Sequence, residues 1–445
     1  MTETQGSSTI STKLERIAML AKRSPKISFT SLAHFIDIDW LREAYRRTRK
    51  DGATGIDGQT ADDYAAKLEE NLQSLLDRAK SGTYRAPPVR RVHIPKGTSG
   101  ETRPIGIPTF EDKVLQRAVA MVLEAVYEQE FHDGSYGFRP KRSAHQALNV
   151  LRNAAITMKV GWVLEADIRK FFDALDHTHL MVILRRRVCD GVLLRLIGKW
   201  LKAGVLEDGQ LLHPDIGSPQ GGVISPILAN IYLHAVLDEW FADVVKPRLK
   251  SRAHLVRYAD DFVILFARKE DACRVLDVLP KRFGRYGLTL HPEKTRLVCF
   301  RRPVLRPRPD GPRQSKPGTF FLLGFTHHWM KSRQGCWVIK QRTASDRFTG
   351  ALKRVSQWCR ENRHQPVSKQ WQVLKQKLQG HFAYYGITGN SEAIRRFCAE
   401  VRRVFRKWLS RRSQKAHMPW DRMEAMLERY PLPRPRIMRH FHAPA

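Results

Sequence analysis

The sequence has few cysteines, and their spacing fits neither a metal site nor a disulfide framework. Its 445 residues include six cysteines, widely scattered and without a Cys-x-x-Cys pair. Structural zinc sites and small disulfide-rich domains both depend on closely paired cysteines. We therefore expect all six thiols to be reduced.

Long hydrophobic runs are also absent. Hydrophobic residues make up 42% of the chain, enough for two or three packed domains. No run reaches the roughly 18 apolar residues of a membrane-spanning helix, and residues 1–12 lack the apolar core of a signal peptide. We expect no membrane partner and a cytoplasmic location, associated with the nucleoid if the source is bacterial.

Acidic residues are scarce relative to basic ones. There are 44 Asp and Glu residues against 78 Lys and Arg, giving a net charge of +34 and a pI near 10.3. Residues 301–445 hold 32 basic and 8 acidic residues, so this third of the chain carries +24. Such an imbalance indicates a polyanionic partner, and it is strongest in the C-terminal third.

Most of the chain shows helical periodicity, interrupted by short strand-like runs. Residues 1–30 mix Ser, Thr and basic residues, and we expect them to be loosely ordered at the start. The spacing of apolar residues predicts helices over the segments 32–45, 61–79, 111–127 and 227–240. Further apolar stripes over 371–382 and 394–408 predict a helical C-terminal region.

A pair of adjacent aspartates interrupts two apolar, strand-like runs. Asp260 and Asp261 follow residues 255–257 and precede residues 262–266, which predicts a β-hairpin with both carboxylates near its tip. Two neighbouring carboxylates repel each other, and one pKa rises unless a cation compensates. A divalent metal is the simplest compensating cation, whereas the plain alternative is an ordinary Asp-containing turn.

A second acidic strand end lies upstream. Residues 162–168 read as a buried strand with Asp167 near its end. If this strand lies beside the Asp260–Asp261 hairpin, the carboxylates would meet at one sheet edge and could hold two Mg²⁺ ions about 3.5–4 Å apart. Such a site suits nucleotidyl transfer. The alternative for Asp167 is a helix N-cap.

Two further segments could contact a nucleotide. Residues 89–97 and 102–108 predict a basic hairpin, with Lys96 and Arg103 close to its bend. It could fold over a triphosphate, or it could be a solvated basic ribbon. The Gly-rich loop 217–226 precedes a helix and carries Gln220, although it matches neither the Walker pattern nor the dinucleotide fingerprint.

The order of these segments resembles the successive sequence blocks of group II intron-encoded reverse transcriptase/maturases. The blocks are the basic hairpin, Asp167 with Phe171-Phe172, the Gly-rich loop, Tyr258-Ala259-Asp260-Asp261, His291-Pro292-Glu293-Lys294-Thr295 and Phe321-Leu322-Leu323-Gly324-Phe325. The resemblance runs from about Gly55 to about Tyr385. It implies an α+β right-hand polymerase with fingers, palm and thumb. The implied segments are an N-terminal extension (1–54), fingers and palm (55–330), a thumb or maturase domain (331–430) and a Pro/Arg tail (431–445).

The resemblance also implies roles for individual residues. Asp167, Asp260 and Asp261 would be catalytic and would bind two Mg²⁺ ions, with Mn²⁺ as the alternative metal. Lys96 and Arg103 would contact the phosphates of the incoming nucleotide, and Gln220 would lie by the nucleotide and template. Phe172 would be the steric gate against a ribose 2′-hydroxyl, or simply a core aromatic. Lys294 would contact a phosphate or donate a proton, or it could be a solvated lysine.

The same resemblance implies several partners. They are a group II intron RNA, an RNA template with a DNA primer, dNTPs and target DNA, used in DNA synthesis, splicing and retrohoming. Leu378–Gly386 resembles the maturase-specific thumb segment. Five arginines on the helical stripe of residues 394–408 would contact RNA: Arg395, Arg396, Arg402, Arg403 and Arg406.

One feature departs from many family members, because no paired cysteines and histidines of an endonuclease domain follow the thumb. Target cleavage is therefore not expected, and a primer would come from another source. Two alternatives stay open. One is an RNA-binding splicing factor with an idle polymerase fold, and the other is an RNA polymerase or domesticated reverse transcriptase.

Overall fold

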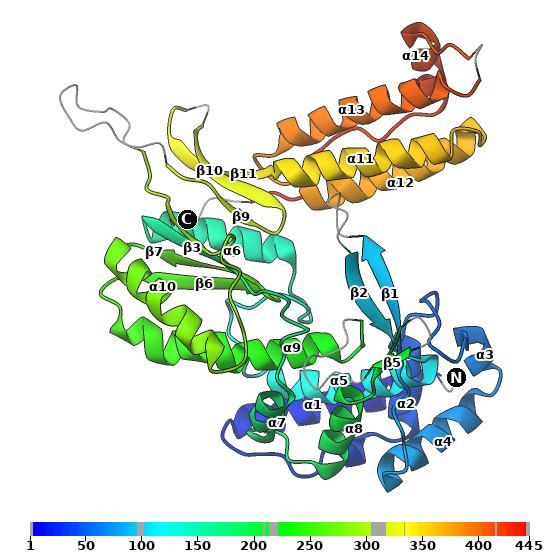
Figure 1. Cartoon of the computed structure of the whole chain (residues 1–445), viewed down its shortest axis with the longest axis vertical. Helices are drawn as coiled ribbons and strands as arrows, with labels where there is room; N and C mark the ends of the chain where they lie inside the picture. Colours follow the sequence, from blue (N-terminus) through cyan, green and yellow to red (C-terminus); the bar gives the residue numbers. More distant parts are fainter. Residues whose placement is uncertain are drawn as a thin grey trace. The chain divides into compact units, whose positions relative to one another are not determined.

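The computed structural model describes residues 3–95, 102–207, 210–212, 221–303, 317–332, 334–413 and 416–441. The chain divides into two compact units. The first comprises Met1–Ala147, Ala166–Phe262 and Cys273–Arg296, and the second comprises Leu148–Glu165, Val263–Ala272 and Leu297–Ala445. Both combine helices with strands (Figure 1), which confirms the predicted α+β class. The sequence-based domain boundaries stay a prediction.

The helical part of the first unit is built around α5 (Phe110–Tyr127). This helix is buried on nearly all sides, as expected for one that is apolar around most of its circumference. α1, α2, α3 and α9 all contact it. The helices of this part are α1 (Glu3–Arg23), α2 (Ile38–Arg47), α3 (Ala61–Ala65), α4 (Leu68–Ser81), α7 (His177–Arg185), α8 (Gly191–Leu201) and α9 (Ser225–Leu233).

The sequence-based helix predictions for this region are largely confirmed. The helix predicted over 111–127 matches α5 closely. The segment 61–79 forms two helices, α3 and α4, and the segment 32–45 forms a 3₁₀ turn (Ala33–Phe35) followed by α2. Short breaks of this kind fall within the boundary error of periodicity arguments.

The prediction that the N-terminus is loosely ordered was wrong. Residues 3–23 form α1, which packs against α2 and α5. Ile10, Ile17 and Ala21 are buried and recur at intervals of seven and four residues, so they share one helical face. The Ser- and Thr-rich composition concealed this apolar stripe.

The predicted basic hairpin is confirmed. β1 (Val89–Pro95) and β2 (Thr102–Ile107) pair antiparallel, with Ile94 opposite Arg103. Two short strands that were not predicted, β4 (Val205–Glu207) and β5 (Gln210–Leu212), extend the sheet in the order β2-β1-β4-β5.

A second sheet carries the predicted acidic strand ends. Its strands are β3 (Trp162–Asp167), β6 (Ala253–Tyr258), β7 (Asp261–Phe266) and β8 (Arg296–Cys299). Their order is β6-β7-β3-β8, so the strand that ends at Asp167 is the neighbour of the strand that begins at Asp261. This arrangement is the one that the sequence argument required. Two further helices occur in this part of the chain: α6 (Ala144–Thr157) precedes β3, and α10 (Lys269–Gly284) lies between β7 and β8.

The apolar helix predicted over 227–240 is not regular. α9 ends at Leu233, and the chain continues through two π-helical segments, His234–Asp238 and Trp240–Val245. A 3₁₀ turn, Lys246–Arg248, follows. A π turn inserts an extra residue, so the faces of this helix change along its length.

Four consecutive helices of the second unit form a bundle with an apolar seam. They are α11 (Ser345–Glu361), α12 (Val367–Tyr385), α13 (Ser391–Leu409) and α14 (Trp420–Arg429). Leu374, Leu378 and Phe382 from α12 pack with Ile394 and Val401 from α13, as both predicted stripes require. The unit also holds a sheet of order β11-β10-β9, formed by β9 (Phe320–Leu322), β10 (Phe325–Lys331) and β11 (Trp337–Thr343).

The described part of the C-terminal segment is packed against the second unit. Arg439 pairs with Ile387 in a parallel bridge, and the amides of Met438 and Arg439 donate to the carbonyl of Gly386. Phe441 packs with Phe325 and Ile387. Residues 431–438 form no strand, and the pairing is confined to the isolated bridge at Arg439.

Two features noted in the composition can be followed in the described residues. All six cysteines are free of disulfide bonds, and the reduced state of their thiols stays a prediction. No helix in the described ranges combines the length and hydrophobicity that membrane crossing requires.

Candidate active site

The aspartate turn joins β6 to β7 in a strained conformation. β6 ends at Tyr258 and β7 begins at Asp261. Ala259, between them, has a left-handed backbone with φ of 55°, which costs an alanine about 1–2 kcal/mol. Asp260 and Asp261 are both half-buried. The surrounding structure must therefore hold this turn in place.

One carboxylate and two guanidinium groups act on the Asp260 carboxylate. Burial raises the pKa of Asp260, and the negative charge of Asp167 raises it further, whereas the charges of Arg103 and Arg257 lower it. Asp260 therefore feels the negative charge of Asp167, and the role of both carboxylates in metal binding stays a prediction. Arg103, on the exposed face of β2, acts on the same carboxylate.

The end of β3 is fixed by the segment that follows α10. The amide of His291 donates to the carbonyl of Asp167 (2.8 Å), and Ile168 pairs with Leu290 in an antiparallel bridge. The same segment brings Lys294 to the site, where its Nζ lies 2.7 Å from Asp167 Oδ2. Lys294 is nevertheless exposed, so the solvated alternative stays open, as does contact with a phosphate. The ion pair places a cation on a carboxylate that was predicted to bind metal.

The side chains at this edge suit a hard divalent cation. Carboxylate oxygens are the preferred ligands of Mg²⁺, and both the repulsion felt by Asp260 and the ammonium on Asp167 indicate that positive charge is favoured here. Within the described ranges, no three His, Cys, Asp or Glu side chains are already gathered closely enough to form a metal cage. Which of the carboxylates would hold a metal therefore stays a prediction.

Phe172 lies in the turn that follows β3. Its ring contacts that of Phe171 edge-on, with centroids 5.3 Å apart, and Phe171 is buried against Tyr232. Phe172 itself is half-buried. The Phe172 ring is thus supported by Phe171 while part of it stays accessible to solvent. This environment is compatible with a steric gate and with a core aromatic. The steric-gate role stays a prediction.

Two predicted nucleotide-binding residues, Lys96 and Gln220, lie outside the described residues. The described residues that follow Gln220, at the end of the Gly-rich loop, show where this loop packs. Gly221 has φ of 114°, and a Cβ there would lie 2.6 Å from the carbonyl oxygen of Gly106. The amide of Ile224 donates to Gln116 of α5 (3.3 Å). The end of the Gly-rich loop therefore packs against β2 and α5.

The five arginines predicted to bind RNA differ in their surroundings. Arg395, Arg396 and Arg403 are exposed, whereas Arg402 and Arg406 are half-buried. Arg403 pairs with Glu400 (2.7 Å), and Arg396 lies over the Phe348 ring. Arg406 donates to the Met418 carbonyl and lies over Trp420. Arg406 therefore has a packing role, and RNA contact by all five stays a prediction.

Sequence reasoning missed a buried polar network beneath the aspartate turn. Arg257, Asp238 and Asn230 are buried and bonded to one another. One signal was available in the sequence, since Arg257 follows two apolar residues in a strand and Asp238 lies within an apolar helix. Charged residues at such positions are rarely fully buried unless they are paired.

Comparisons with known proteins agree with this arrangement. Residues 94–327, more than half of the chain, match the reverse transcriptase (RNA-dependent DNA polymerase) family. Protein YkfC of Escherichia coli (strain K12) is 34% identical over 328 residues, covering 65% of this chain and 84% of YkfC.

Intron-encoded proteins are also among the relatives. Group II intron-encoded protein LtrA of Lactococcus lactis subsp. cremoris is 40% identical over 225 residues, which cover 50% of this chain but only 37% of LtrA. Nuclear intron maturase 2, mitochondrial, of Arabidopsis thaliana is 29% identical over 175 residues. The chain therefore belongs to the reverse transcriptase (RNA-dependent DNA polymerase) family.

Proposed function

We propose that the chain extends a DNA primer on an RNA template through a two-metal nucleotidyl transfer centred on Asp167, Asp260 and Asp261. The observation that carries this proposal is the sheet order, in which β3, ending at Asp167, lies beside β7, which begins at Asp261. The charges of Asp167 and Arg103 both act on Asp260, which supports placing a triphosphate close to these carboxylates.

Each residue has a task in this reaction. Two Mg²⁺ ions, or Mn²⁺ in their place, would activate the primer 3′-hydroxyl and neutralise the leaving oxygen. Asp167, Asp260 and Asp261 would hold them. Arg103 and Lys96 bind the triphosphate as cations, and Gln220 contacts the nucleotide and template.

Phe172 and Lys294 complete the assignment. The Phe172 ring, braced by Phe171, excludes a ribose 2′-hydroxyl and so selects dNTPs. Lys294 pairs with Asp167, and a divalent cation would compete with its ammonium for that carboxylate. The Lys294 ammonium would contact a phosphate or donate a proton to the pyrophosphate.

The natural nucleic acid partner in this proposal is a group II intron RNA. The support is the +24 charge of residues 301–445 together with the intron-encoded relatives. The chain would bind the intron, assist its splicing and copy it at target DNA during retrohoming. A bacterial protein of this kind would work in the cytoplasm, at the nucleoid.

Primer extension tests the polymerase proposal. The assay uses a DNA primer on an RNA template with dNTPs and Mg²⁺. Asp260→Asn should lower the rate by at least about 10³-fold, since metal-assisted charge stabilisation contributes several kcal/mol. RNA affinity should be unchanged. Asp173→Asn, an exposed carboxylate in the turn after β3, is the matched control and should be active.

The opposite results are equally informative. Equal rates for the wild type and Asp260→Asn would remove Asp260 from the site. Tight RNA binding with no extension by the wild type would favour the splicing factor with an idle polymerase fold.

A further inference from the structure

The aspartate turn is held from below by a single buried guanidinium. Arg257 is 0% exposed. Its Nη1 donates to the carbonyl oxygen of Ala259 (3.0 Å), which is the left-handed residue directly before Asp260. Because the carbonyl of Ala259 belongs to the peptide that carries the amide of Asp260, this hydrogen bond fixes where that peptide lies.

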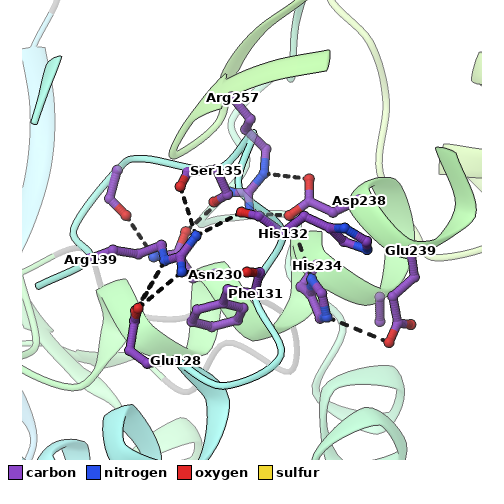
Figure 2. A network of polar contacts seen from close by, with 12 residues as sticks. Glu128, Phe131, His132, Ser135, Arg139, Asn230, His234, Asp238, Glu239 and Arg257 are labelled. Atoms are coloured by element: carbon purple, nitrogen blue, oxygen red, sulfur yellow. Dashed lines mark hydrogen bonds and ion pairs between the residues drawn. The ribbon is translucent and has the colours of Figure 1, made fainter. Parts of the chain in front are cut away.

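The same guanidinium is tied to the helix that follows the Gly-rich loop. Nε and Nη2 donate to the two carboxylate oxygens of Asp238 (2.9 and 2.5 Å), and Nη1 also donates to Asn230 Oδ1 (3.1 Å). Figure 2 shows Arg257 reaching Asp238 and Asn230 at the centre of the network. The two-oxygen contact with Asp238 restricts how the guanidinium can rotate.

The π-helical turn explains how both partners reach one guanidinium. Asn230 lies on α9 and Asp238 lies at the end of the π-helical segment, eight positions later. In a regular α-helix of 3.6 residues per turn, residues seven apart lie about 20° apart around the axis, whereas residues eight apart lie about 80° apart. One extra residue in a π turn restores the alignment.

A second set of contacts holds the turn from its other side. Asn230 Nδ2 donates to the carbonyl of Gly137 (2.7 Å), and a Cβ on Gly137 would lie 2.3 Å from the backbone nitrogen of Ala259. Residue 137 must therefore be glycine for the loop to approach. Arg139, which pairs with Glu128 and donates to the carbonyls of His132 and Ser135, fixes this loop (Figure 2).

The strands leading into the turn are locked as well. The amide of Arg257 donates to the Gly134 carbonyl (2.8 Å), and the amide of Tyr136 donates to the Arg257 carbonyl (2.9 Å). The backbone of residue 257 is thus fixed independently of its side chain. Loss of the side chain should therefore release Ala259 without unravelling β6.

Stability alone does not account for the buried ion pair. Desolvating two charges costs several kcal/mol each, and well-packed apolar residues of similar volume are often as stable or more stable. An apolar pair could fill the same space, but it could not donate a hydrogen bond to the Ala259 carbonyl. The ion pair therefore supplies what an apolar pair lacks, a hydrogen-bond donor directed at the Ala259 carbonyl.

We propose that Arg257 is a positioning residue for catalysis, which holds the Ala259–Asp260 peptide so that the Asp260 carboxylate is placed for metal binding. Asp238 and Asn230 serve to aim the guanidinium. This inference rests on the proposed function, because it assigns Arg257 to the same reaction.

The test separates positioning from packing. The double variant Arg257→Met/Asp238→Leu replaces the ion pair by apolar side chains of similar size. We expect a melting temperature and a primer–template affinity like those of the wild type. The rate of primer extension should fall about 10- to 100-fold, and the Mg²⁺ concentration for half-maximal rate should rise. Wild-type rate and Mg²⁺ dependence in a folded double variant would overturn the proposal.

Two further variants guard against misfolding of the double variant. Arg257→Lys keeps the charge and a donor, so it should recover part of the rate. Asn230→Ala leaves the ion pair intact but removes the Asn230 contacts to Arg257 and Gly137, and it should shift the Mg²⁺ dependence in the same direction. An unchanged Mg²⁺ dependence in folded Asn230→Ala would also count against the proposal.

Direct metal binding distinguishes failure of this inference from failure of the proposed function. Mn²⁺ binding to each protein is measured by calorimetry without nucleotides. If the wild type extends no primer, the proposed polymerase activity fails. Positioning would still be supported if the double variant bound Mn²⁺ about tenfold more weakly than the wild type, and it would be refuted if the two affinities were equal.

Discussion

Arginines serve opposite purposes in the two units of this chain. In the first unit Arg257 is buried and directs its donors to three fixed partners, Asp238, Asn230 and the Ala259 carbonyl. In the second unit Arg395 and Arg403 lie exposed on α13, whose opposite side forms the apolar seam. A buried guanidinium with fixed hydrogen-bond partners holds those partners in one arrangement. Exposed guanidinium groups create a positive electrostatic potential that can attract a polyanion in many orientations.

This contrast has an energetic counterpart. Removing one partner of a buried ion pair leaves an uncompensated charge and costs about 3–5 kcal/mol. An exposed pair contributes about 0–1 kcal/mol and is screened by salt. Substitutions in the first unit should therefore have large, specific effects, and substitutions on α13 should have small effects that add up.

The largest effect should come from the buried ion pair. Burial acts to raise the pKa of Asp238, but Arg257 and His234 outweigh it and lower the pKa to about 2. Because the folded pKa is depressed, the stabilisation is complete above pH about 4 and is lost as the pH falls toward 2.

Urea unfolding of Asp238→Asn and the wild type measures this stabilisation. The difference in unfolding free energy should be large at pH 6 and should shrink on acidification to pH 3. Glu400→Gln, which breaks the exposed Arg403–Glu400 pair, is the matched control and should cost less than about 1 kcal/mol at either pH. A difference for Asp238→Asn that does not change with pH would contradict the ion-pair explanation.

The next effect concerns nucleotide selection at Phe172. Phe172→Val should lower the preference for dNTPs over rNTPs by about 10- to 100-fold, because loss of steric bulk in a pocket changes discrimination by that order. The ratio of kcat/KM values for a matched dNTP and rNTP measures it. Phe171→Leu, which alters the buried supporting ring, should mainly reduce stability. Unchanged discrimination in Phe172→Val would leave Phe172 as a core aromatic.

The contrast between the units also explains what could be predicted from the sequence. The aspartate hairpin, Asp167 and the helical stripes of α12 and α13 depend on local alternation and periodicity, which can be read within about ten to twenty residues. The side-by-side order of β3 and β7 was a supposition from residue chemistry, and the sheet confirms it.

Long-range contacts were beyond that reasoning. Arg257 meets Asp238 and Asn230 from 19 and 27 residues away, across a π turn that shifts the helical register. No local pattern encodes that shift. The ion pair between Lys294 and Asp167 joins residues 127 positions apart, so the sequence left Lys294 with a solvated alternative.

The smallest single effect, and the one that tests additivity, should come from the arginines of α13. Arg402→Gln/Arg403→Gln should weaken RNA binding a few-fold and reduce the slope of log affinity against log salt by about 0.7 for each RNA phosphate that is no longer neutralised. Filter-binding titrations over a range of salt concentrations measure the slope. Arg406→Gln is a useful control, because the contacts of Arg406 to Met418 and Trp420 predict a loss of stability with little change in the slope. An unaltered slope in the double variant would mean that α13 does not face RNA. The exposed basic residues that bind RNA would then lie on another surface of the second unit.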